Sequence, residues 1–145
     1  MILNQQRAVR LMRRPLEKFL HRLQRELGFQ EAGVTIALVS DAEIARMNET
    51  FRKKKGPTDV LSFPAARRRP RWPYKRMKED EFLGDIAIAP ALARRYARKH
   101  GRTFPGELRV LILHGVLHLM GYDHETDHGE MDRVERKLRK RFGLA

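Results

Sequence analysis

The spacing of apolar positions along the chain predicts several helices. Between Pro15 and Gly28, one helix face is formed by apolar residues that recur every three or four positions: Leu16, Phe19, Leu20, Leu23 and Leu27. Caps and prolines predict three further helices. The capping box of Ser40 and Glu43 begins one that runs to about residue 51, and Pro90 begins another that runs to about residue 100. Asp127 and Glu130 begin the last helix, which ends at Gly143.

Short runs rich in β-branched residues predict strands between these helices, at residues 2–5, 34–39, 60–63 and 84–89. Neither an internal repeat nor a domain linker is visible. We therefore expect an α/β (α+β) fold, with one domain over residues 1–145 and a small mixed sheet packed against helices.

Residues 105–120 predict a different kind of helix, because they are apolar on almost every side and should be buried. His114 and His118 stand four positions apart, on one face of this helix. A buried imidazole needs a partner for each ring nitrogen. A shared metal ion would supply one, and a hydrogen-bonded core cluster is the alternative. We expect a central, buried, metal-binding helix of the zincin-like kind.

Gly121 allows this helix to end and the chain to turn, which would bring His124 to the same point as a third ligand. Three protein ligands with an open fourth position are typical of catalytic zinc. His128 is a weaker ligand candidate, because such a site keeps its fourth position open. The chain has no cysteine, so the ligands are nitrogen or oxygen atoms. We expect one Zn²⁺ per chain, although imidazole also suits nickel and other divalent ions.

The spacing H-x3-H-x2-G-x2-H also occurs in the long signature of the zinc proteases. Those enzymes carry a glutamate directly after the first histidine, where it acts as the general base. This chain has Gly115 at that position. The ligand spacing is therefore shared with the proteases, whereas their peptidase chemistry is not expected.

Three blocks of the sequence resemble the YbeY family of bacterial endoribonucleases: HGVLHLMGYDH (114–124), MNETFRKKKGPTDVLSFP (47–64) and LGDIAI (83–88). Their order and intervals fit over essentially the whole chain. The resemblance implies trimming of 16S ribosomal RNA toward its mature 3′ end and a part in ribosome quality control. It also implies the small ribosomal subunit and its proteins as partners. By position, Arg52 matches the arginine thought to assist catalysis in that family.

The charge of the chain independently favours a polyanionic partner. It has 31 Lys and Arg against 18 Asp and Glu, a net charge of +13. Basic residues gather in two segments, 52–55 and 67–78, and the second also contains Trp72 and Tyr74. Phosphate attraction combined with aromatic rings suits single-stranded RNA. The candidate RNA contacts are Lys53, Lys54, Lys55, Arg68, Arg69, Arg71, Trp72 and Tyr74. The alternative for the second segment is a flexible, solvated run of charges.

The sequence gives no reason to expect a membrane partner. Two prolines in the second basic segment oppose an amphipathic helix there. No segment reaches the roughly 18 apolar residues that span a bilayer, and the first residues do not resemble a secretory leader. We expect a cytoplasmic protein.

Arg52 and His114 are the candidate catalytic residues. Attack at a phosphodiester builds negative charge on the non-bridging oxygens, and the planar guanidinium of Arg52 can hold two of them. The sequence alone does not separate Arg52 from Lys53 in this role. Asp123 either orients a ligand imidazole or caps the turn. Substrate contact or an ordinary structural role is open for three further polar residues: Asp59, Ser62 and Asp85.

Together these features predict metal-assisted hydrolysis by a single-strand-specific endoribonuclease. Zinc lowers the pKa of its bound water to about 7, which makes the absence of the protease glutamate less damaging. Either the metal hydroxide attacks the phosphate ester, or the metal acts mainly as a Lewis acid on the phosphoryl oxygen. Two other functions stay open. One is a zinc peptidase, and the other is a ribosome-assembly factor that binds RNA and whose metal is structural.

Overall fold

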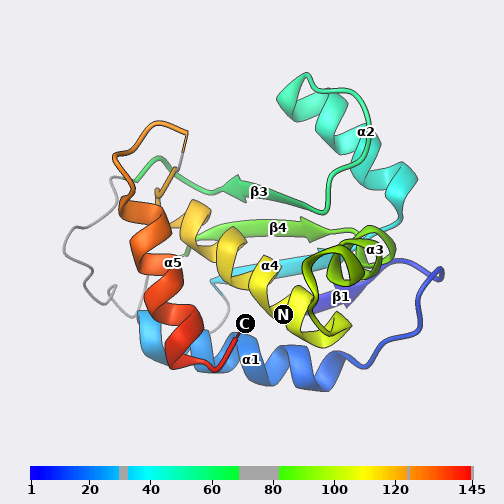
Figure 1. Ribbon diagram of the computed structural model, residues 1–145. Coiled ribbons are helices and arrows are strands. Elements are labelled where there is room, and N and C mark those ends of the chain that lie inside the picture. Colours follow the sequence, from blue (N-terminus) through cyan, green and yellow to red (C-terminus); the bar gives the residue numbers. More distant parts are fainter. Residues whose placement is uncertain (30–32, 69–81, 124, 145) are drawn as a thin grey trace.

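The computed structural model describes residues 1–29, 33–68, 82–123 and 125–144 (Figure 1). Its helices and strands are, in chain order, β1 (Ile2–Asn4), α1 (Arg13–Leu27), β2 (Val34–Leu38), α2 (Asp41–Arg52), β3 (Val60–Pro64), β4 (Gly84–Ile88), α3 (Pro90–His100), α4 (Phe104–Leu119) and α5 (Glu130–Arg141). The elements predicted from the sequence are therefore present, with ends that differ by a few residues.

Local chemistry explains where two of the helices begin. The Ser40 hydroxyl accepts the backbone N–H of Glu43 at 3.1 Å and caps α2 as predicted. The Glu43 carboxylate pairs with Arg46 one turn further on. Helix α1 begins at Arg13, so Pro15 lies in its first turn, where a missing N–H costs nothing.

The sheet is mixed, as the sequence predicts. Its strand order is β1-β2-β4-β3. Strands β1, β2 and β4 run parallel, whereas β3 is antiparallel to β4 and forms one edge. In this register Ser62 of β3 lies opposite Ile86 of β4, and both lie on the sheet face that α4 covers.

Helix α4 is the centre of the structure (Figure 1). It packs against β3 and β4 and also contacts α1, α3 and α5. Ile86 and Ile88 of β4 join its apolar side chains in the main core cluster. A second cluster lies on the opposite face of the sheet, where Leu61 and Ala87 pack against Ile44 of α2. The sheet therefore separates α2 from α4.

None of the helices in the described ranges is long and apolar enough to cross a membrane.

Candidate functional site

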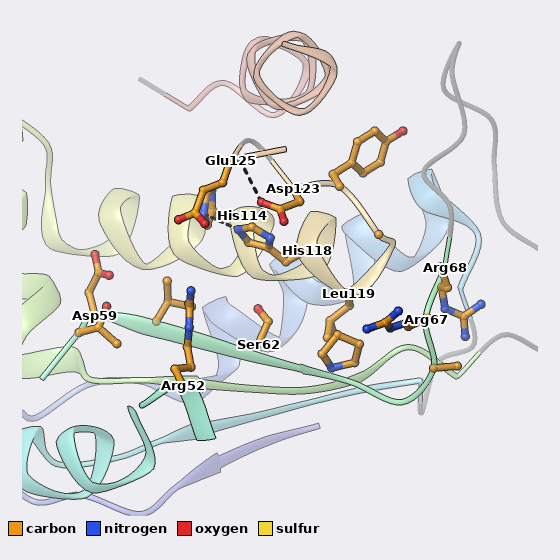
Figure 2. A pocket seen from close by; sticks show the side chains of 16 residues that line it. Arg52, Asp59, Ser62, Arg67, Arg68, His114, His118, Leu119, Asp123 and Glu125 are labelled. Carbon is orange, nitrogen blue, oxygen red and sulfur yellow. Dashed lines mark hydrogen bonds between the residues drawn. The ribbon is translucent and has the colours of Figure 1, made fainter. Parts of the chain in front are cut away.

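A cavity of about 540 Å³ lies at the C-terminal end of α4 (Figure 2). Its walls come from the end of α2, from β3 and the residues beside it, and from α4 with its following turn. The lining residues are Arg52, Thr58, Asp59, Val60, Ser62, Pro64, Ala66, Arg67, Arg68, His114, His118, Leu119, Gly121, Tyr122, Asp123 and Glu125. Predicted site residues from separate segments, among them Arg52, His114 and Asp123, thus share one cavity.

The two α4 histidines face each other in this cavity. The Nε2 atoms of His114 and His118 are 3.0 Å apart. Their rings meet nearly edge to face, with centroids 4.6 Å apart and an interplanar angle of 78°. This arrangement follows from the helical repeat, which places positions four apart on one face. The two imidazoles therefore lie on one face of the helix, as predicted.

Glu135 of α5 completes the surroundings of His114. One carboxylate oxygen lies 3.1 Å from His114 Nδ1 and 3.4 Å from the guanidinium of Arg139. Burial alone raises the pKa of Glu135, but the hydrogen bond and charge of His114 and the neighbouring Arg139 outweigh it, so that this pKa is lowered. A hydrogen bond from Nδ1–H to the carboxylate leaves the Nε2 lone pair of His114 directed at His118.

Sequence reasoning missed Glu135. The signal was the position of a charged residue beside the apolar stripe of α5, formed by Met131, Val134 and Leu138. A carboxylate beside that stripe is partly buried, where it needs a partner. The sequence does not say which partner, because His114 lies 21 positions earlier in the chain.

The turn after α4 begins as the sequence predicts. Helix α4 ends at Leu119, and Gly121 has φ of 101°, a conformation that glycine adopts without strain. The Asp123 carboxylate accepts the N–H of Glu125 at 3.0 Å, which corresponds to the turn-capping alternative. His124 lies outside the described residues. Within the described ranges, no group of three or more His, Asp or Glu side chains is placed to hold a metal ion, so the three-ligand site stays a prediction.

Arg52 reaches the cavity from the opposite wall. Figure 2 shows its side chain rising from α2, past β3, on the side of the cavity that faces His114. The next residue, Lys53, ends α2 with φ of 58°, which is uncommon for a residue with a side chain. Lys53, Lys54 and Lys55 are all exposed and lie outside the cavity lining. The structure thus distinguishes Arg52 from Lys53, which the sequence did not.

Asp59 and Ser62 line the cavity, whereas Asp85 does not. Burial raises the pKa of Asp59, an effect strengthened by Glu107 and opposed by backbone N–H groups and His114. The Ser62 hydroxyl donates to the Gly115 carbonyl at 3.2 Å and ties β3 to α4. The Asp85 side chain is exposed on β4. Asp59 and Ser62 therefore combine a structural contact with access to the cavity.

A sequence profile of the family described as Endoribonuclease YbeY matches residues 1–143. An Endoribonuclease YbeY from Solibacter usitatus is 42% identical over 139 residues, which cover 95% of this chain and 85% of the relative. That from Koribacter versatilis is 39% identical over 144 residues, covering 99% and 86%. The solution structure of a Thermotoga maritima protein matches with a TM-score of 0.62 and 30% identity, over 99% of this chain and 90% of that one. The chain belongs to the endoribonuclease YbeY family.

The basic segment after β3 enters the cavity of this YbeY-family chain at its described end. Arg67 and Arg68 line the cavity. The Arg68 guanidinium also donates to the Phe82 carbonyl at 2.7 Å. The other predicted RNA contacts of this segment lie outside the described residues: Arg69, Arg71, Trp72 and Tyr74.

Gly115 shows how this family member departs from the zinc proteases. Position 115 faces the sheet, and an added Cβ would lie only 2.8 Å from the Cδ1 atom of Ile86. Ile86 is 1% exposed and has little room to move. A glutamate at this position would therefore collide with β4 rather than extend into the cavity.

Proposed function

We propose that this protein is a single-strand-specific, metal-dependent endoribonuclease. The observation that carries the proposal is the cavity, which places two facing imidazoles opposite the guanidinium of Arg52. Imidazole nitrogens suit a divalent cation, and a guanidinium suits a phosphate. The names of the relatives support RNA as the substrate.

The residues in the cavity fit a zinc ion in their chemistry. Two Nε2 atoms 3.0 Å apart are close enough to bind one ion, since zinc–nitrogen bonds measure about 2.0–2.1 Å. A carboxylate on the other ring nitrogen is the usual companion of a histidine that binds metal. His114 and His118 would hold the ion, with His124 as the third ligand. When bound, zinc supplies Lewis-acid stabilisation at the phosphoryl group and makes water a stronger nucleophile.

The protein's own side chains position the substrate and hold its charge. Arg52 offers two N–H groups in a plane to the non-bridging phosphate oxygens, on which negative charge grows during attack. Glu135 fixes the ring of His114 through Nδ1. Arg67 and Arg68 extend the positive wall along the path of the RNA backbone. Single-stranded RNA suits this open, cationic wall, because its backbone bends and its bases are free to stack.

Ribosomal RNA is the substrate in the cell under this proposal, with trimming of the 16S 3′ end and ribosome quality control as the setting. The small ribosomal subunit and its proteins are then the partners, and the cytoplasm is the place of action. Support comes from the family resemblance and from the net charge of +13, which favours association with an RNA-rich particle.

The two alternatives are less well supported. A zinc peptidase needs a base after the first histidine, and position 115 has no room for one. An assembly factor with a structural metal does not need Arg52 in the same cavity as the histidines, because that guanidinium contributes nothing to a closed structural site.

The test is cleavage of a labelled single-stranded RNA and of its duplex by protein of known metal content. We expect cleavage of the single strand alone, its loss in a chelator, and its recovery when zinc is returned. Casein serves as the peptidase substrate. Metal-loaded protein that leaves the single strand intact would refute the proposal, and unfolding of His118→Ala in place of a folded, inactive variant would indicate a structural metal.

A further inference from the structure

One exposed aromatic ring lies next to Arg52 in the chain, on the α2 side of edge strand β3 and outside the lining of the cavity. Phe51 is 64% exposed, although it is a large apolar residue. It belongs to the last turn of α2, directly before Arg52, which lines the cavity. Single exposed apolar residues are common on proteins and need no function. The case for Phe51 therefore rests on its neighbours.

The ring of Phe51 is supported from one side. Phe63 of β3 meets it edge to face, with centroids 5.3 Å apart and an interplanar angle of 77°. Phe63 is partly buried and packs against the core cluster between the sheet and α2. The Phe51 ring thus has a fixed support and a large solvent-exposed surface, as a stacking platform requires.

The chain around Phe51 is built to carry positive charge. Arg52, Lys53, Lys54 and Lys55 follow it and are all exposed. Asn48, which is 6% exposed, anchors this segment: its side chain donates to the Gly56 carbonyl at 3.0 Å, and its own carbonyl accepts the N–H of Lys54 at 3.3 Å. A nucleic-acid strand has phosphates along its backbone and a base on each nucleotide. A run of cations can bind the phosphates, and an exposed ring next to it can stack on a base.

We propose that Phe51, supported by Phe63, is a stacking subsite for one unpaired base of the RNA strand, next to the phosphate held by Arg52. Adjacent side chains of a helix point in different directions, so Phe51 packs on Phe63 from the α2 side while Arg52 reaches the cavity. One strand that bends around β3 can meet both side chains. The strand passes from the cavity around the edge strand β3 toward α2. This inference rests on the proposed nuclease function and assigns it a base-binding site.

The experiment measures binding of a short single-stranded RNA whose phosphorothioate linkages resist cleavage. It is repeated with a series of abasic strands, each of which lacks one base at a different position. Phe51→Ala should bind the intact strand about ten-fold more weakly, which corresponds to ~1.4 kcal/mol. One abasic strand should weaken wild-type binding by a similar factor and leave the binding of Phe51→Ala unchanged. Phe51→Trp should keep or improve the affinity.

Two controls separate stacking from charge and from folding. Met12→Ala removes another exposed apolar side chain, 76% exposed at the start of α1, and should leave RNA affinity unchanged. Lys54→Ala should flatten the salt dependence of binding by about 0.7 log units, whereas Phe51→Ala should not alter it. Melting temperatures establish that each variant is folded, and Phe51→Trp carries the test if Phe51→Ala is destabilised.

Equal affinity of Phe51→Ala and wild type for the intact strand would overturn the subsite, as would an equal loss on every abasic strand in both proteins. If Phe51→Ala is unstable, weaker binding by folded Phe51→Trp would overturn it. These results leave the nuclease proposal standing when the wild type cleaves the single strand. A wild type that neither binds nor cleaves RNA would instead remove the proposed function itself.

Discussion

The two walls of the cavity differ in how firmly the protein holds them. On the α4 wall, the side chains of His114 and Glu135 are only 26% and 12% exposed and hydrogen-bond to each other. On the α2 wall, Arg52 is open to solvent, and its neighbour Phe51, outside the cavity lining, is 64% exposed. The hydrogen bond on the α4 wall holds His114 before substrate arrives, whereas Arg52 on the α2 wall faces solvent. We call the α4 wall, the more buried of the two, the buried wall and the α2 wall the exposed wall. We therefore expect changes on the first wall to affect metal binding, and changes on the second to affect RNA.

The largest effect is expected from His118→Ala on the buried wall. Removal of one of two facing imidazoles should eliminate most of the bound metal and abolish cleavage, while the protein stays folded. Metal analysis of the purified variant, with circular dichroism as the folding control, measures both. Full metal occupancy in a His114→Ala, His118→Ala double variant would contradict the assignment of the site.

Arg52→Lys tests the exposed wall and should have the next largest effect. The charge stays but the planar fork is lost, so kcat should fall by about 10–1000-fold, or ~1.4–4 kcal/mol. RNA affinity, metal content and melting temperature should stay close to wild type, because the contact is made mainly in the transition state. Lys53→Ala is the matched control and should cost affinity only. If Lys53→Ala lowers kcat as much, Arg52 has no special role.

Glu135→Ala tests whether the support of His114 matters for the buried wall. Without the carboxylate, neither the orientation nor the tautomer of the His114 ring is fixed, so metal affinity should weaken by about 10–100-fold. Glu135→Gln should have an intermediate affinity. A competition titration with a zinc-binding dye gives the dissociation constant without reference to activity. Asp132→Ala on the same helix is the control, since that carboxylate is 59% exposed and pairs with Arg136. Wild-type metal affinity in Glu135→Ala would show that the contact is incidental.

The smallest effect is expected from Asp59→Asn, which changes a residue that lines the cavity. Burial raises the pKa of Asp59 above its ordinary value of 3.8. The stability it contributes is therefore present below pH 3.8 and lost as the pH rises through its raised pKa in the folded protein. Near neutral pH, Asp59→Asn should stabilise the protein by less than about 1 kcal/mol, because solvent screens a partly exposed charge. Melting curves at acid and neutral pH test this, and a gain that grows toward acid pH would contradict it.

Much of the buried wall could be predicted because its signals are local. The apolar run that forms α4, the four-residue spacing of His114 and His118 and the helix end before Gly121 all depend on neighbours within one or two turns. The capping of α2 by Ser40 is equally local. The sequence could not decide whether Asp123 orients a ligand imidazole or caps the turn, because this depends on where the turn directs its carboxylate.

The sequence by itself determined the elements of this protein, the pair of facing imidazoles and the excess of positive charge, because helical periodicity and composition are properties of the chain. Only the tertiary structure decided that Glu135 of α5 supports His114, that Arg52 and not Lys53 reaches the cavity, and that position 115 has no room beside Ile86. Each of these contacts joins elements separated along the chain. They follow from the packing of α4 between the sheet and α5, a balance of many side chains that no local pattern records.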